Sequence, residues 1–217
     1  LMKIFLNKFK KKRDIKILDI GSGTGRNAEM FSQFGKVVST DMHESAIRYI
    51  RSRSIEVVKS NAEKIPFKNG SFDFVFTLDV LEHLDNDSVA IKEVYRVLKK
   101  DGVFVISVPA FKFLWGRHDV ALNHKRRYSK KDLKSVMDDK FYFQRTTFWN
   151  FFLFPPVFFS RMFRKTSSEE LPKSDSTDIP FFLNKMFLLL IKTENQLIKR
   201  GIDLPFGVSL MAVLKKK

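Results

Sequence analysis

The chain has 217 residues, of which 44% are hydrophobic and none is cysteine. One sizeable core is therefore expected rather than two domains, and disulfides, thiolate metal sites and cysteine nucleophiles are excluded. Forty Lys and Arg against 24 Asp and Glu give a net charge of +16, which favours an anionic partner such as nucleic acid, phospholipid or a phosphorylated substrate.

Residues 1–15 form a basic, weakly amphipathic segment without the apolar stretch of about 7–15 residues that a signal peptide requires. We therefore expect a cytoplasmic protein. The first residue is Leu1 rather than methionine, which leaves the natural start of the chain open. Residues 1–217 are interpreted as a single domain.

The first half of the chain alternates between predicted strands and helices. Apolar patterning predicts strands at 16–20, 37–41, 55–60 and 72–78, and helices at 26–35 and 44–52. Strands that alternate with helices favour a mostly parallel sheet covered on both faces.

The second half continues the pattern. Apolar residues spaced i, i+3, i+4 and i+7 predict a helix over 88–100, ended by Asp101-Gly102 before a strand at 102–108. A capping box at 129–132 predicts the start of another helix. Two further strands are predicted at 141–149 and 207–214.

Three glycines, Gly21, Gly23 and Gly25, follow the first predicted strand. Such a turn lets backbone N–H groups and a helix N-terminus approach a ligand without interference from side chains. Asp41 ends the second predicted strand, where a carboxylate can accept hydrogen bonds from both ribose hydroxyls. A dinucleotide-binding turn would need glycine in place of Arg26, so the spacing favours a different nucleotide-like cofactor.

The pattern Asp19-Ile-Gly21-Ser-Gly23-Thr-Gly25 resembles the first motif of class I S-adenosylmethionine-dependent methyltransferases. Segments 61–67, 70–84 and 93–109 are similar to later segments of that family in the expected order, and the C-terminal pattern resembles its ubiquinone-biosynthesis-like, type 11 group. The resemblance implies a Rossmann-like, doubly wound sheet of seven strands, mostly parallel with an antiparallel last strand. Residues 150–206 would form a helical insertion between strands six and seven.

The resemblance also implies S-adenosylmethionine as the cofactor. Asn61 stands where the family has an acid that faces the adenine amino group, and its amide oxygen could still accept that hydrogen bond. The residues assigned to the cofactor are Asp19, Gly21, Ser22, Gly23, Gly25, Arg26, Asp41, Met42, Asn61, Ala62, Glu63, Leu78 and His83.

Three of the four histidines follow the predicted fourth and fifth strands, at the edge where ligands bind in open α/β sheets. A histidine can take a proton from a hydroxyl near neutral pH, so His118 or His124 is the predicted base of an O-methylation. The alternative for each is a structural hydrogen bond within its loop, and for His83 that role is favoured.

A metal site built from Glu82, His83, His118, Asp119 and His124 is an open alternative, but their spacing along the chain is loose. We therefore expect no metal and a direct in-line displacement in which positioning supplies most of the acceleration.

Four residues are predicted to contact the acceptor: Trp115, Arg126, Arg127 and Tyr128. The two arginines could clamp an anionic group. The alternative is that they belong to a solvated basic loop.

Residues 146–160 carry no charge, and 180–192 are similarly apolar around one lysine. Each is shorter than the roughly 20 apolar residues of a membrane-spanning helix. They suggest a lid over an apolar pocket or a surface in the lipid interface, with a helical hairpin packed on the sheet as the alternative. Residues 166–178 are polar and predicted to be a linker.

The sequence therefore predicts a methyltransferase that acts on a small-molecule, lipid-linked or glycan-related acceptor, with peripheral association at the inner membrane face as a further hypothesis. One alternative is an RNA methyltransferase, which the charge of +16 favours but which lacks an Asn-Pro-Pro-aromatic motif after the fourth predicted strand. The other is a non-catalytic cofactor-binding protein, against which the intact glycine motif argues.

Overall fold

The structure, a computed structural model, describes residues 14–163 and 180–217. Nearly all of the basic N-terminal segment and the whole predicted linker at 166–178 lie outside the described residues.

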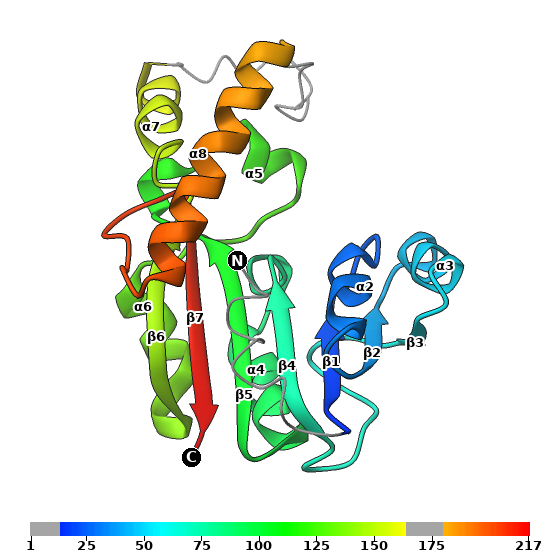
Figure 1. The fold of residues 1–217 in the computed structure, drawn as a ribbon. Helices are drawn as coiled ribbons and strands as arrows, with labels where there is room; N and C mark the ends of the chain where they lie inside the picture. Colours follow the sequence, from blue (N-terminus) through cyan, green and yellow to red (C-terminus); the bar gives the residue numbers. More distant parts are fainter. Residues whose placement is uncertain (1–13, 164–179) are drawn as a thin grey trace.

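Seven strands form one sheet within the described residues, in the order β3-β2-β1-β4-β5-β7-β6 (Figure 1). Strands β1 to β5 pair in parallel, whereas β7 runs antiparallel to both β5 and β6. The predicted sheet with an antiparallel last strand is therefore confirmed. The strands are β1 (Lys16–Ile20), β2 (Lys36–Asp41), β3 (Glu56–Lys59), β4 (Phe72–Leu78), β5 (Leu98–Pro109), β6 (Phe141–Trp149) and β7 (Ser209–Lys216).

Helices cover both faces of the sheet: in Figure 1, α8 crosses in front of β7, and α4 and α6 lie behind the sheet. The α-helices are α2 (Arg26–Ser32), α3 (Glu44–Ser52), α4 (Asp87–Val97), α5 (Arg117–Ala121), α6 (Lys130–Met137), α7 (Phe154–Phe163) and α8 (Phe181–Lys199). Three short 3-10 helices are η2 (Leu81–His83), η3 (Lys112–Leu114) and η4 (Asp138–Lys140).

The end of α4 differs from the prediction. The helix stops at Val97 and β5 begins at once, with Leu98 paired to Phe72. The ladder resumes at Phe74 and Val103, so residues 99–102 form a bulge rather than a helix cap. The ammonium of Lys216, from the last strand, donates to the carbonyls of Tyr95 and Leu98 at 2.6 and 2.7 Å, which satisfies the helix end from outside.

The predicted capping box at the start of α6 is present. The Asp132 N–H donates to Ser129 Oγ at 3.1 Å, and the Ser129 N–H donates to Asp132 Oδ2 at 3.0 Å. This reciprocal pair satisfies two backbone donors that the helix geometry would otherwise leave free.

Helices α7 and α8 lie between β6 and β7 in the sequence. The second half of α8 is anchored to the body by Glu194, whose buried carboxylate accepts the N–H groups of Asn150 and Phe152 at 2.9 and 2.8 Å. Ile198 is fully buried, whereas residues 181–186 at the start of α8 are all exposed. The helix therefore projects beyond the sheet, as Figure 1 shows.

Candidate cofactor and acceptor site

The glycine turn closes against the end of β2. The N–H groups of Gly21 and Ser22 donate to the Thr40 carbonyl at 2.8 and 3.1 Å. Gly21 has φ +67°, and a Cβ there would lie 2.6 Å from Val80 Cγ2, so a side chain would strain the turn and displace Val80. Gly23 has φ +54° and open space where a Cβ would stand. The turn therefore presents bare backbone at that point.

Asp41 is buried at the carboxyl end of β2 and is held by two backbone donors. Its Oδ2 atom accepts the Gly23 N–H at 3.0 Å, and its Oδ1 atom accepts the His43 N–H at 2.9 Å. The carboxylate thus connects the glycine turn to the start of α3.

A cavity of about 300 Å³ lies at the carboxyl ends of β1, β2 and β4, beside the point where the strand order reverses. Its lining residues are Ile20, Gly21, Asp41, Met42, His43, Ser60, Ala62, Asp79, Val80, His83 and Leu84. Five of these are among the predicted cofactor residues. Of the remainder, all but Leu84 end a predicted strand or lie within two residues of its end, and that position was the signal that could have found them.

The predicted adenine segment follows β3 and makes its own turn. The Asn61 side-chain oxygen accepts the Glu63 N–H at 2.8 Å, and Glu63 Oε1 accepts the Asn86 N–H at 3.1 Å. The Asn61 amide oxygen, which is predicted to accept a hydrogen bond from the adenine amino group, therefore already accepts one from the protein backbone.

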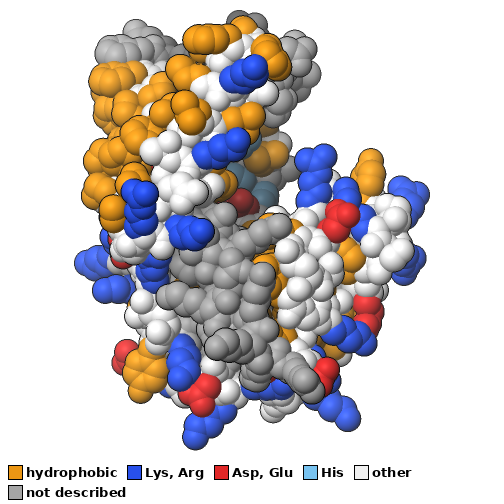
Figure 2. Space-filling model, in the orientation of Figure 1, with side chains coloured by type: hydrophobic (Ala, Val, Ile, Leu, Met, Phe, Trp, Pro, Cys, Tyr) orange, Lys and Arg blue, Asp and Glu red, His pale blue; other side chains and the backbone are white. Residues whose placement is uncertain are grey.

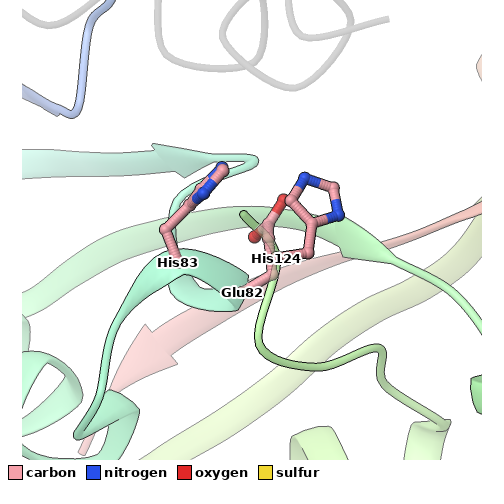
Figure 3. A group of neighbouring side chains, drawn as sticks. All are labelled: Glu82, His83 and His124. Atoms are coloured by element: carbon pink, nitrogen blue, oxygen red, sulfur yellow. The ribbon is translucent and has the colours of Figure 1, made fainter. Parts of the chain in front are cut away.

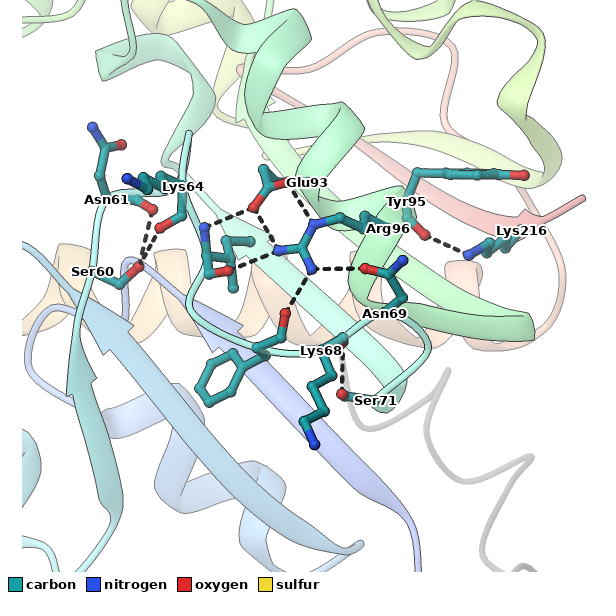
Figure 4. Close-up of polar contacts among 12 residues, drawn as sticks. Ser60, Asn61, Lys64, Lys68, Asn69, Ser71, Glu93, Tyr95, Arg96 and Lys216 are labelled. Atoms are coloured by element: carbon teal, nitrogen blue, oxygen red, sulfur yellow. Dashed lines mark hydrogen bonds and ion pairs between the residues drawn. The ribbon is translucent and has the colours of Figure 1, made fainter.

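Arg96, on α4, braces the next residues of this segment (Figure 4). Its guanidinium donates to the carbonyls of Ile65 and Phe67 at 2.8 and 2.6 Å and also bonds Glu93. Glu93 in turn accepts the Ile65 N–H at 2.8 Å. The wall of the cavity formed by this segment is thus fixed from α4.

Acids and histidines gather beside the cavity. Asp79 directly follows β4, with φ +57°, and accepts a hydrogen bond from the Ser107 hydroxyl at 3.0 Å. Burial raises the pKa of Asp79, and that hydrogen bond opposes the rise. Glu82 is fully buried, and within the described chain neither of its carboxylate oxygens has a hydrogen-bond partner. Burial, followed by the charge of Asp79, raises the pKa of Glu82 to about 8. Burial and the neighbouring His124 lower the pKa of His83.

Asp119 organises the loop that faces this cluster. Its Oδ1 atom lies 2.7 Å from Arg127 Nε and 2.9 Å from His124 Nδ1, and its Oδ2 atom accepts the Gly116 N–H at 2.9 Å. Burial opposes ionisation of Asp119, but the hydrogen bonds from Arg127 and His124 outweigh it and hold its pKa below the usual range. Figure 2 shows histidine and acidic side chains at the floor of a hollow between the α8 side and the α2 side of the molecule.

Comparison with known proteins identifies the cofactor. A methyltransferase domain family model matches residues 18–106. A probable S-adenosylmethionine-dependent methyltransferase of Mycobacterium tuberculosis is 31% identical over 129 residues, which cover 57% of this chain and 47% of that protein. Residues 18–106 therefore match a methyltransferase domain, and the comparisons support a class I S-adenosylmethionine-dependent methyltransferase. S-adenosylmethionine is therefore its cofactor.

Two further proteins are similar to this chain. The ubiquinone/menaquinone biosynthesis C-methyltransferase of Cronobacter sakazakii is 30% identical over 128 residues, covering 52% of this chain and 51% of that protein. The match thus spans about half the length of both curated relatives. A solved Thermotoga maritima structure, described as a possible histamine N-methyltransferase, shares the fold with a TM-score of 0.63 at 22% identity, covering 99% of this chain and 88% of that chain.

The cavity residues fit the cofactor. Asp41 presents an oriented carboxylate suited to the ribose hydroxyls, and Gly23 leaves its backbone open to the methionine moiety. Gly25 and Arg26 stand at the start of α2, and Leu78 ends β4, so these predicted residues belong to the same sheet edge.

Asp19 lies beneath the glycine turn, 2% exposed, and its Oδ2 atom has no hydrogen-bond partner among residues 14–163 and 180–217. Burial raises its pKa to about 7, the Ser22 hydrogen bond opposes the rise and the Asp41 charge adds to it. Such a group costs stability once it ionises in the folded state.

Asp19→Asn should flatten the pH dependence of stability. Because the pKa of Asp19 is raised on folding, the folded state binds more protons between its unfolded pKa, near 4, and about 7, and stability falls as pH rises through that window. Between pH 4 and pH 8, the free energy of unfolding of the variant should rise relative to that of the parent by on the order of 4 kcal/mol. Urea unfolding measures this, with the exposed Asp14→Asn as control. Parallel pH profiles for parent and Asp19→Asn would refute the assignment.

Three of the predicted acceptor residues are engaged by the protein itself. Arg127 is 3% exposed and donates to the Ala110 carbonyl at 2.9 Å as well as to Asp119. The Tyr128 hydroxyl donates to Asp87 Oδ2 at 2.8 Å, and Arg126 pairs with Asp87 at 3.0 Å. The contacts with Asp87 hold the loop against α4. All three side chains therefore have partners within the protein.

Trp115 and His118 differ from those three. The Trp115 side chain is exposed, with 41% of its surface accessible. The His118 ring is half-buried, its centroid lies 6.2 Å from that of His124, and its Nδ1 atom has no hydrogen-bond partner in the described part of the chain. Contact of either residue with an acceptor stays a prediction.

Proposed function

We propose that the protein methylates a hydroxyl oxygen of a small-molecule, lipid-linked or glycan-related acceptor while associated with an anionic membrane surface. The observation that carries this proposal is the position of the cofactor cavity. The cavity adjoins a cluster of histidines at the floor of a hollow, and one side of that hollow rises to the apolar α7 and α8.

When bound, S-adenosylmethionine supplies an electrophilic methyl carbon, and its transfer to a hydroxyl breaks the carbon–sulfur bond, leaves the electron pair on sulfur and releases the hydroxyl proton. The chain has two tasks in this chemistry: it holds the acceptor oxygen in line and it receives the proton. His118 or His124 receives the proton. His124 is the nearer to the cavity, since its ring centroid lies 4.8 Å from that of His83, which lines the cavity wall.

The start of α8 supports an apolar acceptor and a lipid surface. Phe181 and Phe182 are 73% and 76% exposed, and Leu189 is 64% exposed. Figure 2 shows hydrophobic side chains gathered over α7 and the first half of α8, with basic side chains among them. Exposed apolar area on this scale marks an interaction surface. Among the described residues no helix has the length and apolar content to cross a bilayer, so the proposed contact is at the interface.

Basic residues accompany this surface. The Lys185 ammonium lies 4.6 Å from the Phe181 ring centroid, and Lys192, about two turns further along α8, is exposed. Lysines can keep their ammonium groups at the headgroups while their stems cover apolar surface. Attraction to anionic lipid contributes about 1 kcal/mol per basic residue near the surface. The Cronobacter relative, named for ubiquinone/menaquinone biosynthesis, is further support for an apolar acceptor.

The protein should co-sediment with anionic liposomes, more strongly at low salt. Phe181→Ser combined with Phe182→Ser should lower the partition constant about 100-fold or more, because burying each ring in the interface contributes about 1.5–3 kcal/mol. Tyr49→Ser, which removes a 60% exposed aromatic from α3, is the matched control and should leave partitioning unchanged. A parent protein that stays in the supernatant at low salt excludes the membrane proposal.

The acceptor class is tested by incubating the protein with methyl-labelled S-adenosylmethionine and, separately, a bacterial lipid extract, a glycan extract and total RNA. The proposal expects label in the lipid or glycan fraction as a base-stable ether. Label in RNA alone would favour the RNA methyltransferase alternative, and label in none of the three would favour a non-catalytic role.

A further inference from the structure

The structure assigns a binding site for a divalent transition-metal ion to Glu82, His83 and His124. Each offers one ligand atom, and these atoms lie within 4.8 Å of one another. Glu82 and His83 are neighbours on η2, whereas His124 comes from the loop after α5. Figure 3 shows the three side chains converging from these two segments.

Glu82 is the first reason for this assignment. It is 0% exposed, and in the described segments both carboxylate oxygens lack hydrogen-bond partners. A buried carboxylate without partners is costly, and buried acids normally pair with a cation or ligate a metal. Arg127 does not fill that place, since it donates hydrogen bonds to Asp119 and to the Ala110 carbonyl. A bound metal ion would provide the Glu82 carboxylate with a partner.

His124 is the second reason. Its Nδ1 atom lies 2.9 Å from Asp119 Oδ1, which leaves Nε2 as the free ring nitrogen. An imidazole that bonds a carboxylate through one nitrogen and a metal through the other is the usual arrangement of a metal-ligating histidine, because the carboxylate fixes the ring. Asp119 is itself 0% exposed and held by Arg127, so this support is rigid.

The backbone also holds the two segments together. The Lys125 N–H donates to the Glu82 carbonyl at 2.7 Å, and the His124 N–H donates to the Asp119 carbonyl at 2.8 Å. The ligands are therefore prearranged by contacts that do not involve a metal. Metal bonds of about 2.0–2.2 Å place any two ligand atoms no more than about 4.4 Å apart, so side chains at the 4.8 Å limit must draw inward when the ion binds.

The donor set defines the class of ion. One carboxylate oxygen and two imidazole nitrogens suit Zn²⁺, Co²⁺, Mn²⁺ or Fe²⁺ rather than Ca²⁺ or Mg²⁺, which prefer oxygen ligands. Three protein ligands leave coordination positions open, and His83 also lines the cofactor cavity.

An open metal position beside the methyl donor could take the acceptor hydroxyl and favour its ionised form. That role rests on the proposed function, whereas metal binding does not. With His124 as a ligand, the hydroxyl proton passes to His118. This proposal replaces the metal-free displacement expected from the sequence.

The test is a Co²⁺ titration of the full chain, freed of metal with a chelator and measured without cofactor or acceptor. The parent should bind one Co²⁺ per chain with the visible absorption of a low-symmetry nitrogen and oxygen complex. Glu82→Gln and His124→Asn should each weaken binding at least tenfold, and Asp119→Asn by about 10–100-fold through loss of ring orientation. His43→Asn, the one histidine outside the loops after β4 and β5, is the control and should not change Co²⁺ affinity.

Because His83 is exposed, His83→Asn should fold even where a buried variant does not, and it must also weaken Co²⁺ binding at least tenfold. A parent that shows no such absorption, or equal affinity in His83→Asn and the parent, overturns the site. Since no methyl transfer is measured, an inactive protein that binds Co²⁺ would reject only the proposed function.

Discussion

Asp41→Ala is expected to weaken S-adenosylmethionine binding by about 10–150-fold, because a hydrogen bond to a charged group contributes about 1.5–3 kcal/mol. The Asp41 carboxylate has two roles in this protein. It accepts the Gly23 N–H at 3.0 Å and the His43 N–H at 2.9 Å, so it shapes the glycine turn, and it faces the cavity where the ribose is expected. Isothermal titration of the cofactor measures the change directly.

Glu56→Ala is the matched control for this experiment. Glu56 is an exposed acid at the amino end of β3, where it pairs with Lys36, at the sheet edge away from the cavity. Its loss should leave cofactor affinity unchanged. If Asp41→Ala binds the cofactor within about threefold of the parent, the assignment of the ribose site is wrong.

His118→Asn is expected to reduce turnover by about 10²–10⁴-fold while leaving cofactor affinity unchanged, because it removes the proposed proton acceptor. His118 is suited to this role by its half-buried ring near His124. Steady-state turnover with the acceptor found in the labelling experiment provides the measurement. Val120→Asn, an exposed position on the same short helix, is the control for the loop itself.

The turnover of the His118 and His124 variants should respond differently to added metal. His124→Asn should lose turnover that excess divalent metal partly restores, since it weakens a ligand, whereas His118→Asn should not respond. Near-parental turnover in both variants would eliminate a histidine base and with it the proposed O-methylation.

The sheet and the cofactor edge could be predicted because they depend on local patterns. Asp19, the three glycines and Asp41 stand at fixed offsets from two strands, and parallel strands bring those offsets to one edge. The antiparallel β7 followed from the family resemblance rather than from its own residues.

The cluster of Glu82, His83 and His124 could not be judged from spacing. His124 lies far along the chain from the other two, and hydrogen bonds such as those from Lys125 to the Glu82 carbonyl and from Arg126 to the Leu84 carbonyl bring its loop back to η2. Along the sequence these residues form a loosely spaced set, from which no metal site is expected. Their convergence depends on tertiary contacts that periodicity does not encode.

Arg127 and Tyr128 illustrate the same limit. A basic stretch ordinarily indicates a solvated or ligand-binding loop, but here Asp119 and Asp87 are buried partners that draw both side chains inward. The end of α4 was likewise set from a distance, by Lys216 on the last strand. In each case a tertiary contact, rather than the local sequence pattern, satisfies the polar group.

A crystal structure of the protein with S-adenosylhomocysteine tests the central claim most directly. We expect the ribose hydroxyls on the Asp41 carboxylate, the amino-acid moiety over Gly23, and the sulfur directed toward the His83 side of the cavity of about 300 Å³. Density for the ligand outside this cavity, or a sulfur directed away from His83 and His124, would contradict both the cofactor site and the acceptor site placed beside it.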